Sequence, residues 1–520
     1  MRHPRLLSAL VLAAAFAFAP DAAAQSAKQR EREKEALSDA REQLRHRQEQ
    51  PRQSAAATCL AFDSERSIEV LIDVLNEDNP HTRDIVWDVL PQFKNPEARK
   101  RVERELRQNK KNADVRQWCA ELLGLYGDAS LAPALEKALA DKEIGVQRAA
   151  ARSLGRLKHG PAAAKLEPFA KTAGKEGADI YLRANAIEAL ARIDAAKYEP
   201  LYERGLSDPD GGVRCALLGA LPAIYPDRAE AASAAALEDR DWRPRLQAVE
   251  NLGAIRSKGA VDALVRAAGD ERPAVRERAN AALRKLTGEK WTLRAQWEGW
   301  WTPNREAFEF PDPEKKKKKD GEAAAKPDEP KAAAAETADP KKYASYNGIT
   351  VQSDHVAFLI DKSEDMEQTL KIGSRVKADV ALEELDATLA KLEPGLLFNV
   401  FTYAAEPTPY RKQPIELDDA SRKAALAFVK KTEHEGKKNI WLALTTVVED
   451  PTLDTLFLLS SGEPEIGRYV HWNRVTEHLK ELNRFHKVVI HTVAYSDSQW
   501  NRDQLQKISE ATGGQFVYKE

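Results

Sequence analysis

The chain is poor in cysteine and carries almost no net charge. Only three cysteines, Cys59, Cys119 and Cys215, occur in 520 residues. This number is too small for a disulfide framework, and because it is odd the cysteines cannot all pair with one another. We expect buried free thiols in helices, with oxidation of one pair in an exported protein as the alternative. Lys+Arg 80 against Asp+Glu 82 gives a net charge of -2, which provides no basic excess for binding nucleic acid.

The sequence also lacks the common catalytic motifs. His-Glu-x-x-His, Cys-x-x-Cys, Gly-x-Ser-x-Gly and the phosphate-binding loop do not occur in it. We therefore predict no enzymatic activity, no catalytic residue and no small-molecule substrate. The histidines of the C-terminal half lack metal-ligand spacing and are interpreted as surface or hydrogen-bonded side chains: His434, His471, His478, His486 and His491.

The first 24 residues have the composition of a secretory signal. A basic start, Met1–Arg5, precedes a short apolar run, Leu6–Ala19, and small residues at Ala22–Ala24 then precede Gln25. The apolar run is shorter than the roughly 20 residues that cross a bilayer, so a membrane anchor is the weaker alternative. We expect cleavage after residue 24, no membrane span, and a periplasmic or extracellular location.

Residues 54–301 contain a unit that recurs about every 31 residues, after a polar lead-in over residues 25–53. Each unit has a leucine on a helical apolar face, a mostly small residue four positions earlier, and in six of seven units an arginine seven positions earlier. The leucines are Leu90, Leu123, Leu154, Leu190, Leu221, Leu252 and Leu283. The residues seven positions earlier are Arg83, Arg116, Gln147, Arg183, Arg214, Arg245 and Arg276.

Two helices in each short unit predict an α-solenoid. The Val-Arg-x-x-Ala-x-x-x-Leu-Gly pattern resembles HEAT repeats, which implies a protein-docking surface and, less favoured, a lyase-like enzyme. We expect each recurrent arginine to bond an aspartate or a carbonyl at a turn between helices, rather than to form an anion-binding ladder. The tryptophans from Trp291 to Trp301 are expected to cover the last core layer, with a stacking platform for ligands as the alternative.

Residues 302–343 are rich in Pro, Lys, Ala and Glu and have no periodic apolar face. This composition predicts a disordered linker, so the two halves are expected to move independently.

Residues 344–520 alternate between apolar strands and amphipathic helices, which predicts a doubly wound α/β sheet. The strands are expected at 356–360, 397–403, 455–459, 488–494 and 515–518. The helices are expected at 375–392, 420–431, 440–448, 469–485 and 503–512.

An apolar strand ends in Asp361-x-Ser363-x-Asp365, where an open sheet presents ligands at its carboxyl edge. This loop and the closing Leu505–Gly514 segment resemble the von Willebrand factor A domain. The resemblance implies a Rossmann-like fold and a metal-ion-dependent adhesion site built from Asp-x-Ser-x-Ser, a distant Thr and a distant Asp. In this chain Lys438 stands where the Thr is expected, and Ser461 where the last Asp is expected.

We therefore predict a degenerate, metal-free site in which Lys438 neutralises Asp361 and Asp365, and no cofactor. The alternative is a weak Mg²⁺ site that uses Asp361, Ser363 and Asp365. The function predicted from the sequence is an exported scaffold that binds protein partners. A cation-dependent adhesion or sensor protein is the second hypothesis.

Overall fold

The computed structural model describes residues 27–77, 79–311 and 344–520. The signal segment and most of the predicted linker lie outside these residues. The chain divides into two compact units between Lys165 and Leu166, and each unit is considered by itself. No helix in the described ranges is long and apolar enough to cross a membrane.

The first unit is entirely helical. Residues 27–43 form a helix whose Leu37 and Ala40 are buried, followed by buried Leu44, so the polar lead-in has an apolar face that the sequence analysis missed. The helices that follow are α2 (Glu49–Phe62), α3 (Glu65–Leu75), α4 (Pro80–Val89), α5 (Pro96–Gln108), α6 (Ala113–Tyr126), α7 (Ala132–Ala138) and α8 (Ile144–Arg156).

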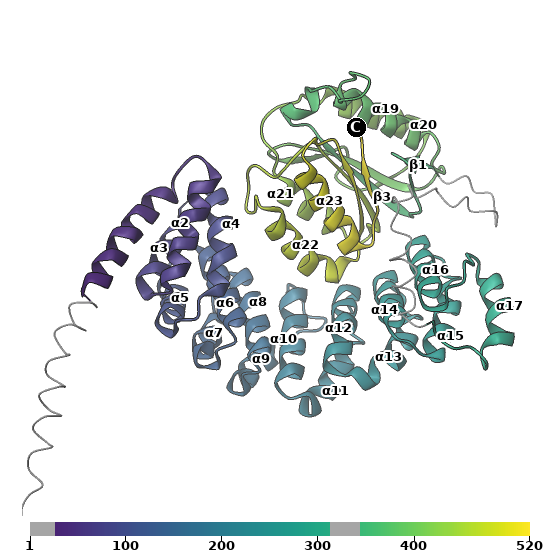
Figure 1. Cartoon of the computed structure of the whole chain (residues 1–520). Coiled ribbons are helices and arrows are strands. Elements are labelled where there is room, and N and C mark those ends of the chain that lie inside the picture. Colours follow the sequence, from purple (N-terminus) through teal and green to yellow (C-terminus); the bar gives the residue numbers. More distant parts are fainter. Residues whose placement is uncertain (1–26, 78, 312–343) are drawn as a thin grey trace, which may run out of the picture. The chain divides into compact units, whose positions relative to one another are not determined.

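The second unit begins with the remaining helix pairs, which stack side by side in chain order (Figure 1). Helices α10, α12, α14 and α16 carry the recurrent leucines, and the intervening helices complete the predicted solenoid. The helices are α9 (Ala163–Ala170), α10 (Ile180–Ile193), α11 (Ala195–Gly205), α12 (Gly211–Ile224), α13 (Ala229–Ala236), α14 (Trp242–Ala254), α15 (Lys258–Ala267), α16 (Pro273–Thr287) and α17 (Arg294–Asn304).

The recurrent arginines hold consecutive repeats together. Four of the six reach an aspartate 25 residues later, at the start of the next unit, through two hydrogen bonds from the guanidinium. The distances from Nε to the carboxylate are 2.7 Å for Arg116–Asp141, 2.9 Å for Arg183–Asp208, 2.7 Å for Arg214–Asp239 and 2.8 Å for Arg245–Asp270. The structural interpretation of the arginines is confirmed for these four.

Trp297 and Trp301 close the end of the repeat array, as expected, whereas Trp291 is exposed. Trp297 is fully buried and its Nε1 donates to Asn280 Oδ1 at 2.7 Å, while Trp301 donates to Asp262. The covering layer extends beyond the predicted boundary at residue 302, because Phe308 packs edge-on against Trp301. All three cysteines are free and buried, and burial raises the pKa of the Cys59 thiol to about 12.

Residues 344–520 form a sheet in the order β5-β4-β3-β7-β8-β9. The neighbours among β4, β3, β7, β8 and β9 are parallel, whereas β5 and β6 pair antiparallel with β4 at the edge. The strands are β1 (Ser345–Tyr346), β2 (Ile349–Thr350), β3 (His355–Asp361), β4 (Leu397–Tyr403), β5 (Pro407–Pro409), β6 (Ile415–Glu416), β7 (Thr455–Ser460), β8 (Val489–Ala494) and β9 (Phe516–Tyr518).

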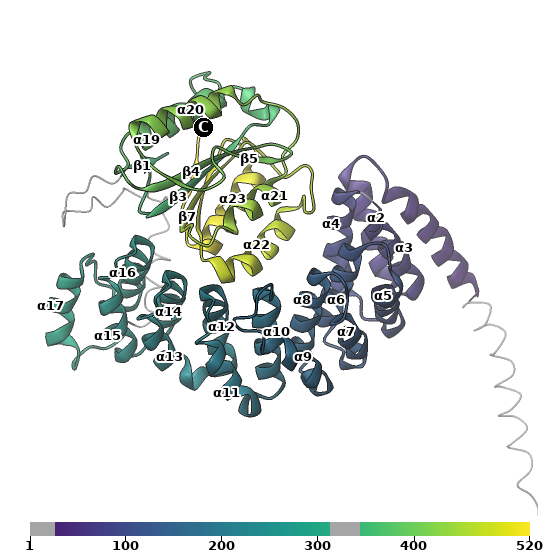
Figure 2. The same ribbon diagram turned by 180° about the vertical axis from the view of Figure 1, so that it is seen from behind.

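Helices cover both faces of this sheet, with α19 and α20 on one side and α21, α22 and α23 on the other (Figures 1 and 2). They are α19 (Lys377–Leu389), α20 (Asp419–Lys431), α21 (Ile440–Val448), α22 (Trp472–His486) and α23 (Gln499–Thr512). The predicted doubly wound sheet is therefore confirmed. The β1–β2 hairpin and the short edge strands β5 and β6 are additions that the sequence analysis did not predict.

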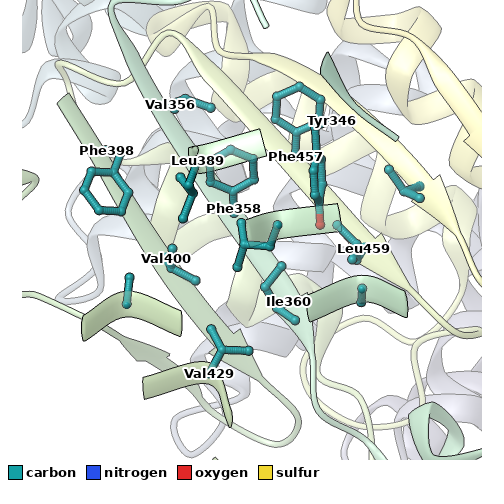
Figure 3. Close-up of a cluster of buried hydrophobic side chains, with 14 of the residues drawn as sticks. Tyr346, Val356, Phe358, Ile360, Leu389, Phe398, Val400, Val429, Phe457 and Leu459 are labelled. Atoms are coloured by element: carbon teal, nitrogen blue, oxygen red, sulfur yellow. The ribbon is translucent and has the colours of Figure 1, made fainter. Parts of the chain in front are cut away.

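The core under α19 and α20 is aromatic at its centre (Figure 3). Phe358 of β3 stacks on Phe457 of β7 with ring centroids 5.5 Å apart, and Tyr346 of the hairpin meets both rings edge-on. This packing fixes the register of β3 and β7, whose carboxyl ends carry the candidate site.

Within the second unit, the end of α22 packs against the repeat helices. Arg484 pairs with Glu188 of α10 at 2.5 Å, and Lys487 pairs with Glu250 of α14 at 2.7 Å. Burial raises the pKa of the Glu188 carboxyl, but the Arg484 charge outweighs it and the net pKa is lowered. Within this unit, side chains at the end of α22 therefore form ion pairs with repeat helices, which the sequence analysis did not predict.

This contact predicts unequal effects of two alanine substitutions around Glu188. Arg484→Ala leaves a buried carboxylate without its main partner and should cost about 3 kcal/mol of unfolding free energy. Arg192→Ala removes a second Glu188 partner, four residues along the same helix, and should cost about 0.5 kcal/mol. Urea unfolding of the full chain measures both, and equal losses would show that the contact does not exist in solution.

Buried histidines predict a loss of stability in acid. Burial lowers the pKa of His491 to about 4; its ring stacks on Phe457 and its Nδ1 accepts from the Gln515 amide at 3.0 Å. Because the unfolded pKa is near 6.5, the unfolded state binds more protons between these values. His491 therefore contributes stability above pH 6.5 that is lost as pH falls toward 4, by up to about 1.4 kcal/mol per pH unit.

His491→Asn keeps an acceptor for the Gln515 amide but cannot titrate. It should lower the free energy of unfolding at pH 7 and flatten the pH dependence of that free energy between pH 6.5 and 4. Urea unfolding at a series of pH values measures both. An unchanged slope would mean that His491 is not buried in its neutral form.

Candidate functional site

The predicted site lies at the carboxyl ends of the parallel strands β3 and β7. Asp361 is the last residue of β3, and Ser363 follows it in the loop. Ser461 directly follows β7, and Lys438 lies two residues before α21 begins. The structure thus brings together residues from three loops that are far apart in the sequence, at the edge where open α/β sheets bind ligands.

Asp361 is fully buried, and its carboxylate is saturated with hydrogen donors. Oδ1 accepts from the Ser363 amide at 2.8 Å, which closes a tight turn after the strand. Oδ2 accepts from both the amide and the hydroxyl of Ser461, at 2.8 and 2.7 Å. Asp361 therefore joins the β3 and β7 loops.

Lys438 is a buried ammonium between acids. Its side chain is 2% exposed, and Nζ lies 2.6 Å from Asp365 Oδ2 and 2.9 Å from Glu465 Oε2. Burial alone would lower the pKa of this lysine, but the bonds to Asp365 and Glu465 and the charge of Asp361 raise it. Lys438 is thus held in its charged form by the acids around it.

Glu465 is a site residue that the sequence analysis missed. Besides the contact with Nζ, its Oε2 accepts from the Lys438 amide at 3.1 Å, and its own amide donates to the Lys438 carbonyl at 2.9 Å. It lies four residues after Ser461, in the loop that follows β7. Glu364, in contrast, is exposed.

The site presents carboxylate oxygens that already have hydrogen donors. The two Asp361 oxygens are bonded as described, Asp365 Oδ2 faces the ammonium, and Asp365 Oδ1 accepts from Gln368 Nε2 at 3.1 Å. In the described ranges, no group of three or more His, Cys, Asp or Glu side chains is arranged to hold a metal ion. Mg²⁺ needs several oxygen lone pairs in octahedral geometry, so this donor set suits an ammonium better.

A cavity of about 90 Å³ lies beside this site, between β3, α19 and α20, with Lys362 and His434 in its wall. Burial lowers the pKa of the Lys362 ammonium. Burial, and then the Lys362 charge, lower the pKa of the His434 imidazole. The histidine is only partly exposed and its Nε2 is buried without a partner, so the interpretation of His434 as a surface or satisfied side chain is wrong.

Comparisons with known protein families agree with this architecture. Residues 104–177 and 229–294 match the model for HEAT repeats, and residues 354–518 match the model for the von Willebrand factor type A domain. A comparison with curated protein sequences finds no match.

Solved structures resemble the two regions separately, at low identity. A von Willebrand factor type A protein from Catenulispora acidiphila is 16% identical over 32% of this chain and 38% of its own, with a TM-score of 0.27. The complex of CpcE and CpcF of phycocyanin lyase from Nostoc sp. is 23% identical over 42% of this chain and 86% of its own, with a TM-score of 0.29. Human deoxyhypusine hydroxylase is 20% identical over 49% of this chain and 97% of its own, with a TM-score of 0.22.

Proposed function

We propose that this protein is an exported, non-enzymatic scaffold. The chain carries HEAT repeats and a von Willebrand factor type A domain, and both modules are typical of protein interaction. Its partner is a protein, bound at the carboxyl edge of the α/β sheet without a bridging metal ion.

The export signal at residues 1–24 is part of the proposal. N-terminal sequencing of protein from the exported fraction should begin at Gln25, and retention of Met1 would contradict export by cleavage.

The observation that carries the metal-free mechanism is the position of the Lys438 ammonium. Three acids, Asp361, Asp365 and Glu465, act on it, and their mutual repulsion requires a positive charge nearby. A lysine supplies that charge permanently as part of the chain. Since a divalent cation would be repelled by the ammonium and would compete with hydrogen donors already bonded to Asp361 and Asp365, we infer that the edge binds its partner through hydrogen bonds and shape.

The second candidate is a domain that still uses a divalent cation as the bridge to its partner. The observation that favours it is the meeting of two hydroxyls, since Ser363 Oγ and Ser461 Oγ lie 3.3 Å apart beside Asp361. A small shift of these side chains would turn oxygen lone pairs toward one point. The two candidates differ in how the protein responds to Mg²⁺ and Mn²⁺.

The first test restores the family's ligand types with Lys438→Thr and Ser461→Asp together. Without metal this variant should unfold several degrees lower than the wild type, because Asp361 and Asp365 lose their counter-charge and gain a further carboxylate. Millimolar Mg²⁺ or Mn²⁺ should recover it, since a ligand that binds only the folded state stabilises that state. The thermal unfolding midpoint of the wild type should shift by less than about 1 °C under the same conditions.

The control is Lys437→Thr, which removes the same charge from the neighbouring exposed position and should leave both the midpoint and the metal response unchanged. Strong stabilisation of the wild type by Mg²⁺ would support the cation-dependent candidate. A double variant that is indifferent to metal would contradict the idea that Lys438 stands in for a cation.

The second test concerns the partner. Immobilised wild-type protein should capture the same protein from the exported fraction in EDTA as in Mg²⁺. Glu364→Arg with Lys437→Glu changes two exposed charges at this edge without touching the buried contacts, and should reduce capture by about tenfold if each contact contributes roughly 0.7 kcal/mol. Capture that requires Mg²⁺ contradicts the metal-free mechanism, and capture unaffected by the variant places the partner elsewhere.

A further inference from the structure

Two lysines are buried at the same edge of the sheet, and their surroundings differ. Lys438 is bonded to two carboxylates. Lys362 is 6% exposed, and its ammonium has no hydrogen bond and no ion pair with any residue in the described ranges. An ammonium carries three hydrogen donors, and those of Lys362 are not taken up by side chains of the described residues. They are therefore available to a molecule in the cavity that Lys362 lines.

The Lys362 backbone fixes this side chain in place. Its amide donates to the Tyr403 carbonyl at 2.7 Å, and its carbonyl accepts from the Glu435 amide at 3.0 Å. The second bond also positions the loop that carries His434, whose Nε2 is buried without a partner. Both side chains line the cavity of about 90 Å³, so two groups that can donate hydrogen bonds converge on one space.

The rest of the cavity wall is mostly apolar. Ile360 and Met366 come from the β3 end of the site, Ala381 and Leu382 from α19, and Val429 from α20. The volume exceeds the space that one water molecule needs, about 10–15 Å³ by the same kind of measure. An apolar chamber with two donors at one place suits a molecule that has a short apolar body and a charged acceptor end.

We propose that this cavity binds a small monocarboxylate of two or three carbons. The carboxylate accepts hydrogen bonds from Lys362 Nζ and His434 Nε2, and the alkyl group lies against Met366, Leu382 and Val429. Charge-assisted bonds of this kind are the stronger ones in proteins. The cavity adjoins the edge proposed for the protein partner and shares Asp361 with it, but acetate binding is measured without that partner, so either proposal can fail alone.

Two acids also line the cavity, and neither competes for Lys362. Both Asp361 oxygens are bonded to Ser363 and Ser461. Asp379 is exposed in the first turn of α19 and forms no ion pair with Lys362. Their charges oppose a bound anion, so we expect binding in the millimolar range rather than tighter.

The experiment measures the thermal midpoint of the full chain at pH 7 in sodium acetate, propionate or chloride at one ionic strength. Acetate and propionate should raise the midpoint by a few degrees in a saturable way, because only the folded state has the cavity. Chloride, which lacks the bidentate acceptor, should not. A midpoint that is the same in all three salts overturns the proposal.

The variant Lys362→Met keeps the side-chain length and removes the donors, and it should abolish the acetate effect. The matched control is Lys430→Met, which removes an exposed charge from the rim of the same cavity and should retain it. If Lys362→Met does not fold, His434→Phe serves in its place, and NMR saturation transfer to acetate measures binding directly. Acetate binding that persists in Lys362→Met or His434→Phe contradicts the assigned site, and its loss in Lys430→Met would show a general charge effect instead.

Discussion

The pairing of buried charge is the constraint on which the rest of this structure depends. In the repeats, four arginines are buried only because each meets an aspartate at the start of the next unit. At the end of α22, the partly exposed Arg484 pairs with Glu188. At the carboxyl edge of the sheet, Lys438 is buried because Asp365 and Glu465 surround it. Lys362 breaks this pattern, because it has no ion pair with any of the described residues and lines a cavity instead.

The fold could be predicted from the sequence wherever the pattern is local or regularly repeated. The leucine and arginine spacing predicted the helix pairs, and the structure gives a reason in four units: an arginine there bonds an aspartate 25 residues later. In the α/β domain, the predicted bounds of β4 (Leu397–Tyr403) and α21 (Ile440–Val448) match the structure at both ends. Continuous apolar runs bounded by turn residues make such strands recognisable.

The candidate site could be predicted only in part. Asp361, Ser363 and Lys438 were placed by the family motif, but Glu465 was not, because it reaches the ammonium through a loop whose path no periodicity determines. The buried, unpartnered Nε2 of His434 was also missed, since a partner's absence is a property of three-dimensional packing. The contact between α22 and the repeats was missed for the same reason: Glu188 and Arg484 are 296 residues apart, and each resembles an ordinary surface charge in the sequence.

The central claim is that the Lys438 ammonium occupies the place of a divalent cation, and NMR of lysine ammonium groups tests it most directly. A buried, doubly paired ammonium exchanges its protons slowly, so Lys438 should give an observable ¹⁵N–¹H₃ signal near neutral pH that disappears in Lys438→Met. Stoichiometric Mn²⁺ should leave that signal unbroadened, because no cation lies beside it. Selective broadening of the Lys438 signal by Mn²⁺ would place a cation in the site and contradict the account.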